Sequence, residues 1–167
     1  NRTVQLRGLR KVFDTPTGKK VAVEGLNLDM YEGQIFVLLG QNGAGKSTTI
    51  SMLTGMAEPT AGSARVLGLD VPADMDQLRH TMGVCLQQDC LWDDLTVEEH
   101  LSFVALMRNL HGTAARDAVL KTVAQVGLRE KLRAQAKTLS GGQKRKLSLG
   151  MALLGDARIV FLDEPSS

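Results

Sequence analysis

The chain has 167 residues, of which 43% are apolar and 23% charged, and its formal net charge is +2. This composition is typical of a globular domain with a real core, and so nearly balanced a charge does not indicate nucleic acid as a partner. No apolar run approaches the roughly 20 residues of a membrane-spanning helix, and no signal peptide is recognised. Cys85 and Cys90 fit neither a zinc pattern nor a disulfide framework, which indicates free thiols in a reducing compartment. We therefore expect a domain that faces the cytosol.

The N-terminal third of the sequence predicts strands. Residues 3–13 and 21–30 alternate between apolar and polar side chains, and a turn at 14–18 separates them. The segment 34–39, which is apolar after Gln34, is typical of a buried parallel strand.

A glycine-rich loop, Gly40-Gln41-Asn42-Gly43-Ala44-Gly45-Lys46-Ser47, follows this run and precedes a helix that Gly55 should end. Glycines allow backbone amides to approach a phosphate, and the start of the next helix adds a favourable dipole. Lys46 places a charge on the β- and γ-phosphates, and the Ser47 hydroxyl suits Mg²⁺. The alternative is a glycine-rich turn with a surface lysine. Because strand and helix flank the loop, the sequence favours a nucleoside triphosphate site.

The middle of the chain continues this alternation. Residues 63–67 predict a strand, 74–80 a short helix and 82–86 a second core strand that ends at Gln87. Thr96 and Glu99 then form a capping box that opens a helical insert. Two further helical segments are expected, one from Thr113 to about Gly127 and one near 129–135.

The last part of the sequence predicts a helix over about 141–154 and a strand over 158–162. The basic cluster Lys144-Arg145-Lys146 on that helix is interpreted as a solvated face. Strands that alternate with helices favour a mostly parallel sheet covered by helices.

Two acids close the final strand. Asp163 stands at its carboxyl end, where a carboxylate can contact the metal of a bound nucleotide, and Glu164 follows, where it can polarise an attacking water. The alternative for Glu164 is an ordinary carboxylate that faces solvent. The phosphate-binding loop in the same chain favours the catalytic interpretation.

A second glycine-rich site, Leu139-Ser140-Gly141-Gly142-Gln143, begins the 141–154 helix. Ser140 suits a helix cap, which would leave the glycine amides for a phosphate, although a plain cap with a flexible entry fits equally well. The order and spacing of this site, the earlier loop and the later Asp-Glu pair resemble the ATP-binding cassette (ABC) proteins, whose signature sequence it matches. The resemblance covers essentially the whole chain.

The resemblance implies an α/β fold, the P-loop NTPase fold of the ABC ATPase type. Such a domain has a mostly parallel core sheet with helices, an N-terminal antiparallel β subdomain and an α-helical insert. The chain would then be an incomplete nucleotide-binding domain, with the ATP-binding core and β subdomain in 1–87 and 136–167 and the helical subdomain in 88–135.

The resemblance also implies roles for single residues. Gln87 would touch Mg²⁺ and the attacking water, Phe13 would stack on adenine and Val21 would pack beside it; a core position is the alternative for Phe13. The implied ATP-binding residues are Phe13, Val21, Gly40, Gln41, Asn42, Gly43, Ala44, Gly45, Lys46, Ser47 and Thr48. The implied metal ligands are Ser47, Gln87 and Asp163, and the implied catalytic residues are Glu164 and Gln87. The residues that would contact the ATP of a partner domain are Leu139, Ser140, Gly141, Gly142 and Gln143.

Three stretches, 41–49, 95–101 and 140–148, resemble the A subfamily of ABC transporters, which is known for moving lipids. One departure is Leu86, where that subfamily often has proline. In the family, two nucleotide-binding domains pair head to tail, and ATP lies between the loop of one and the signature of the other.

We therefore expect an ATPase domain that powers transport of a lipid-like substrate, at the cytosolic face of a membrane, with transmembrane domains and a second nucleotide-binding domain as partners. The isolated chain should bind ATP but hydrolyse it poorly. The alternative is a soluble ABC ATPase that acts on ribosomes or DNA, which the lack of a basic insertion disfavours. A third interpretation, a degenerate domain that only binds ATP, is weakened by the intact Lys46, Asp163 and Glu164.

Overall fold

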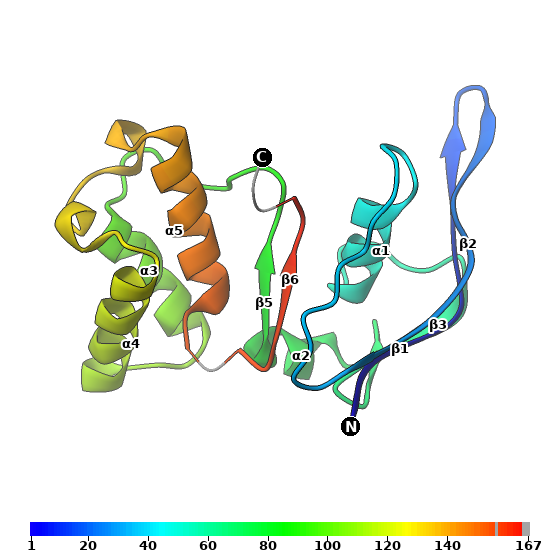
Figure 1. Cartoon of the computed structure of the whole chain (residues 1–167), viewed down its shortest axis with the longest axis horizontal. Helices are drawn as coiled ribbons and strands as arrows, with labels where there is room; N and C mark the ends of the chain where they lie inside the picture. Colours follow the sequence, from blue (N-terminus) through cyan, green and yellow to red (C-terminus); the bar gives the residue numbers. More distant parts are fainter. Residues whose placement is uncertain (156, 165–167) are drawn as a thin grey trace. The chain divides into compact units, whose positions relative to one another are not determined.

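The structure is a computed structural model that describes residues 1–155 and 157–164. It divides into two compact units, Asn1–Arg79 and His80–Ser167 (Figure 1). The first unit carries the phosphate-binding loop, and the second carries the signature and the strand-end acids.

The first unit is built on an antiparallel sheet with the strand order β2-β1-β3-β4. Its strands are β1 (Arg2–Thr15), β2 (Gly18–Tyr31), β3 (Ala61–Val66) and β4 (Leu69–Val71); helix α1 spans Lys46–Leu53, and α2 (Met75–Thr81) begins in this unit. The predicted N-terminal hairpin is confirmed, with longer strands and a tighter turn at Pro16 and Thr17. Val4, Leu6 and Leu9 of β1 are fully buried, so this strand anchors the core of the unit.

The prediction of a buried parallel strand at 34–39 is wrong for the described structure. The run belongs to no strand, and Ile35, Val37 and Leu39 are 97%, 65% and 85% exposed. A buried strand needs a hydrogen-bonded neighbour and cover on both faces, which an apolar run cannot supply by itself. Within Asn1–Arg79 every described strand pairs in the antiparallel sheet, and 34–39 forms the connection from β2 to the loop.

The second unit contains a parallel pair, β5 (Met82–Cys85) and β6 (Ile159–Leu162), with Cys85 in register with Leu162. Among the described residues, β5 and β6 are the strands that form the parallel core sheet predicted from the sequence. Its helices are α3 (Val97–Met107), α4 (Gly112–Gln125) and α5 (Gly141–Leu153), with short 3-10 turns at Arg129–Lys131 and Ala136–Thr138. The predicted capping box of Thr96 and Glu99 is present. The third helix expected near 129–135 is reduced to these short turns.

Helix α5 packs very closely on β5 (Figure 1). A Cβ added at Gly83 would lie 2.0 Å from the carbonyl oxygen of Ala152, so only glycine permits this approach. Arg108, at the end of α3, donates to the carbonyl oxygens of Leu154, Met82 and Ala152. Burial lowers the pKa of this guanidinium. These contacts fix α5 against the strand that leads to Gln87.

Cys85 and Cys90 are free thiols, as predicted, and burial raises the pKa of the Cys85 thiol. No helix among residues 1–155 and 157–164 is long and apolar enough to cross a membrane.

Candidate functional site

The phosphate-binding loop has the backbone that its glycines predict. Gly43 and Gly45 have φ of 83° and 87°, in the left-handed region, and Gly45 is the N-cap of α1. The Lys46 ammonium reaches back across the loop and donates to the carbonyl oxygens of Gly40 at 2.8 Å and Gln41 at 3.1 Å. The loop therefore curls around the lysine, with the first amides of α1 lacking intrahelical partners.

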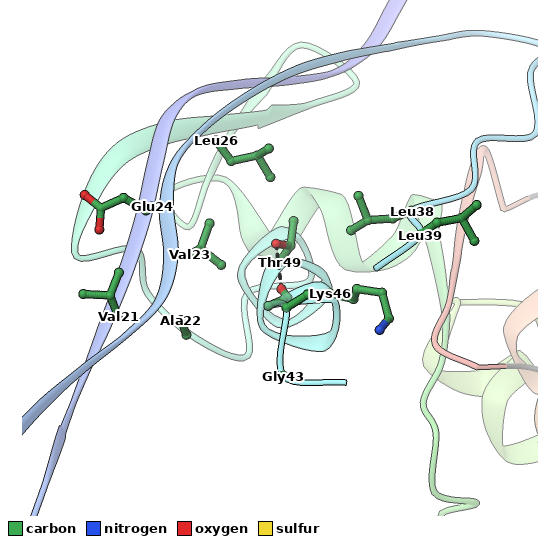
Figure 2. Close-up of a pocket in the computed structure, with 12 residues that line it drawn as sticks. Val21, Ala22, Val23, Glu24, Leu26, Leu38, Leu39, Gly43, Lys46 and Thr49 are labelled. Atoms are coloured by element: carbon green, nitrogen blue, oxygen red, sulfur yellow. Dashed lines mark hydrogen bonds between the residues drawn. The ribbon is translucent and has the colours of Figure 1, made fainter. Parts of the chain in front are cut away.

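An open cavity of about 410 Å³ lies between β2 and this loop (Figure 2). Its size is within the range of small-molecule sites. Val21, Val23 and Leu26 of β2 line one side, and Gly43 to Lys46 line another. Other lining residues include Ala22, Glu24, Leu38, Leu39 and Thr49. Val21 and four of the predicted loop residues, Gly43, Ala44, Gly45 and Lys46, thus line one cavity.

Phe13 lies one rung from Val21 on the hairpin, since Phe13 pairs with Lys20 and Val12 with Val21. Successive residue pairs of a hairpin point to opposite faces of the sheet. Phe13 and Val21, the two predicted adenine contacts, therefore lie at the same end of the hairpin but on opposite faces. Phe13 is 41% exposed, and the Lys11 ammonium lies 5.1 Å from the centre of its ring. This exposure argues against the alternative that Phe13 is a core residue.

The two strand-end acids and Gln87 gather at the carboxyl edge of β5 and β6. The ladder continues past the strands, because the Asp163 amide donates to the carbonyl oxygen of Cys85 at 2.9 Å. The side-chain amide of Gln87 donates to the Glu164 carboxylate at 2.9 Å. Asp163 is 7% exposed. Parallel strands in register therefore place three predicted site residues together.

Arg145 is the functional residue that sequence reasoning missed. The interpretation of 144–146 as a solvated face is wrong for Arg145, whose side chain is 12% exposed. Its guanidinium donates to four main-chain oxygens near the Gln87–Glu164 contact, those of Leu86, Gln87, Asp163 and Glu164. The sequence carries no signal for this, because Lys144 and Lys146 make position 145 look like one more exposed basic residue.

The signature begins α5 as predicted. The Ser140 hydroxyl accepts from the Gln143 amide, and the Gln143 side chain accepts from the Ser140 amide, which completes a capping box. Leu139 is buried beneath it, whereas Gly141 and Gly142 are exposed with open space around them. The helix start is thus fixed by a cap and leaves two bare glycines accessible.

Comparison with known proteins shows the family to which the chain belongs. The family model described as "ABC transporter" matches residues 23–167. The chain is 50% identical over 167 residues to ABC transporter A family member 6 of Dictyostelium discoideum, and 45% identical over 164 residues to the phospholipid-transporting ATPase ABCA3 of Homo sapiens. These two alignments cover 100% and 98% of this chain, but only 10% of each relative. The chain thus spans about a tenth of the length of these relatives.

Solved structures show the same fold. The ATP-binding cassette MJ0796, solved as a dimer in a post-hydrolysis state bound to ADP and Pi, has a TM-score of 0.89 at 23% identity, covering 98% of this chain and 74% of that one. The fold is therefore that of the ABC ATPases, as the resemblance implied. From the family match over residues 23–167, the chain belongs to the ABC transporter family, and it resembles the A-family members over its whole length.

Proposed function

We propose that this chain binds ATP with Mg²⁺ and hydrolyses it as one nucleotide-binding domain of a membrane transporter for lipid-like substrates. The observation that carries the proposal is the contact between Gln87 and Glu164 at the strand edge, next to the buried Asp163. The family resemblance assigns Gln87 to the attacking water independently of Glu164. A hydrogen bond between these two side chains therefore favours a catalytic role for Glu164 over that of an ordinary surface carboxylate.

ATP would bind through the phosphate loop. Amides of Gln41 to Thr48 and the Lys46 ammonium supply positive charge for the phosphate tail, and Val21 supplies apolar surface in the cavity. The carbonyl contacts of Lys46 hold its ammonium over the loop in advance, which lowers the cost of ordering it on binding.

Glu164 would act as the general base for the attacking water. Its carboxylate is oriented by the Gln87 amide donor, so one of its oxygens is fixed and the carboxylate keeps a defined direction. Gln87 is therefore a positioning group for the base as well as a candidate contact of the water itself.

The residues present fit Mg²⁺ in their chemistry. The Ser47 hydroxyl, the Asp163 carboxylate and the Gln87 amide oxygen are hard oxygen donors, which Mg²⁺ prefers. When bound, the ion neutralises charge on the phosphate oxygens.

The exposed signature glycines suit a second copy of the same kind of domain. A helix start with bare glycines offers only part of a phosphate cage, so we expect head-to-tail pairing in which Gly141 and Gly142 face the ATP of the partner domain. A solved relative is itself described as dimeric and bound to ADP and Pi, which supports this proposal. Such a pair would sit at the cytosolic face of the membrane, beneath transmembrane domains.

A lipid-like substrate is favoured by the relatives. One is a phospholipid-transporting ATPase and another, at 47% identity, is the glucosylceramide transporter ABCA12 of Mus musculus. The alternative of a soluble ATPase acting on ribosomes or DNA has no observation in its favour.

The test uses the full-length parent protein in phospholipid vesicles. We expect ATP hydrolysis that phospholipid stimulates several-fold, together with ATP-dependent movement of a fluorescent phospholipid between leaflets. Hydrolysis without any such movement would remove the transport part of the proposal. A purified parent that binds no ATP would remove all of it.

Replacing Phe13 by alanine should raise the KM for ATP by roughly 5- to 150-fold with little change in kcat, because base–aromatic stacking contributes about 1–3 kcal/mol. Phe13→Trp should restore the KM. The control is Tyr31→Ala, an aromatic on β2 that is exposed to a similar extent but outside the predicted stack. Steady-state kinetics of the parent measures all three, and an unchanged KM in Phe13→Ala would contradict the adenine contact.

A further inference from the structure

Arg145 holds two turns of the chain with two separate nitrogens. Its Nη1 donates to the main-chain oxygens of Leu86 and Gln87, the turn that carries the catalytic glutamine. Its Nη2 donates to the main-chain oxygens of Asp163, at 2.9 Å, and Glu164, at 2.8 Å, the turn that carries the acids. One guanidinium thus bridges the two segments that must face each other for hydrolysis.

We propose that Arg145 is a positioning residue that sets the distance between Gln87 and the Glu164 carboxylate; this inference rests on the proposed hydrolysis of ATP. The side chains of Gln87 and Glu164 meet at 2.9 Å, and that distance depends on where their two backbones are held. The Arg145 side chain bonds both backbones. It acts through Gln87 and Glu164 and not on the nucleotide.

The backbone conformation of Glu164 explains why the two turns need the Arg145 bridge. Glu164 has φ of 46°, in the left-handed region that non-glycine residues rarely adopt, so surrounding contacts must hold it there. The Arg145 donor on its carbonyl oxygen is such a contact. Without it, the turn should relax toward a more common backbone and move the carboxylate away from Gln87.

The guanidinium is itself fixed. Its Nη1 lies 3.2 Å from the carboxylate of Asp89, and the side chain is mostly buried, so the planar fork has little freedom. A lysine has one ammonium in place of two separated amino groups and cannot serve both turns with the same geometry. The arrangement therefore requires arginine in particular.

The bridge also connects two parts of the ATPase. Arg145 lies on α5, one turn after the signature glycines Gly141 and Gly142. A displacement of α5 when a partner's nucleotide contacts the signature would move the same guanidinium that positions Glu164. Such a displacement would link the catalytic base of this domain to the occupancy of the partner's site.

The test compares Arg145→Met and Arg145→Lys in the full-length parent, with Arg116→Met as a matched control because Arg116 is exposed on α4. We expect kcat for ATP to fall about tenfold or more in Arg145→Met while the KM for ATP stays within about twofold. Arg145→Lys should recover only part of the loss, and Arg116→Met should match the wild type. In the Glu164→Gln background, Arg145→Met should lower kcat no further, because its effect acts through Glu164.

Hydrogen–deuterium exchange of the same proteins supplies a measurement that does not depend on activity. Peptides over 86–89 and 161–164 should exchange faster in Arg145→Met, whereas peptides of α4 should not change. A kcat like that of the wild type, or unaltered exchange at both turns, would overturn the proposal. If the wild-type parent hydrolyses no ATP, the proposed function fails and the exchange result still decides whether Arg145 fixes the two turns. Should Arg145→Met not accumulate as folded protein, Arg145→Lys carries the same two measurements.

Discussion

Replacing Glu164 by glutamine lowers ATP turnover of the full-length parent by about 10²- to 10⁴-fold, the usual contribution of a general base. The substitution keeps the size and shape of the side chain. The carbonyl oxygen of the substituted amide can still accept the hydrogen bond from the Gln87 amide that the carboxylate now accepts, so the turn is expected to hold. What is lost is the ability to take a proton from water. ATP affinity should therefore stay within about twofold of the wild type.

The measurement is release of ADP together with retention of radiolabelled ATP after rapid gel filtration. Because a base-deficient site keeps its ATP, the proposed head-to-tail pair should stay closed, and retained nucleotide should rise as turnover falls. Glu130→Gln serves as the control, since Glu130 is an exposed acid on the turn Arg129–Lys131. Turnover in Glu164→Gln within about threefold of the wild type would remove Glu164 from its role.

Local signals in the sequence predicted much of the fold. The predicted capping box at Thr96 and the predicted helix cap at Ser140 are both present, because each depends only on residues a few positions apart. The pairing of β1 with β2 also followed from alternation and a short turn. The run 34–39 shows the limit of this reasoning. Its apolar residues indicated burial, but a buried parallel strand depends on neighbours that are distant in sequence.

The candidate site likewise contains residues that the sequence predicts and one residue whose role only the folded structure reveals. Asp163 and Glu164 were predicted from their place at the end of a strand and Gln87 from the family resemblance, and parallel register then brings the three together. Arg145 was not predicted, because its role depends on carbonyl oxygens 58 and 18 positions away, and carbonyl oxygens leave no mark on the residue pattern. Only the packing of α5 against β5 reveals them.

Replacing Gly45 by alanine should lower ATP affinity by at least about 30-fold. Gly45 combines two constraints: its φ is 87°, and an added Cβ would lie 2.3 Å from the carbonyl oxygen of Ala22 on β2. The left-handed backbone costs about 1–2 kcal/mol for an alanine, and overpacking adds about 1–3 kcal/mol. The loop would have to move away from β2, which deforms the cavity and the curl around Lys46.

Gly43→Ala separates these two effects. Gly43 has nearly the same φ, 83°, but nothing lies within 4 Å of the position that its Cβ would take. It should therefore show only the backbone penalty, an affinity loss of about tenfold. Equilibrium binding of a fluorescent ATP analogue to the full-length parent measures both variants, with thermal unfolding as a check on folding. If the two losses are equal, contact of the loop with β2 has no part in shaping the ATP site; if Gly45→Ala is much worse, the hairpin acts as the rigid wall against which the phosphate-binding loop is formed.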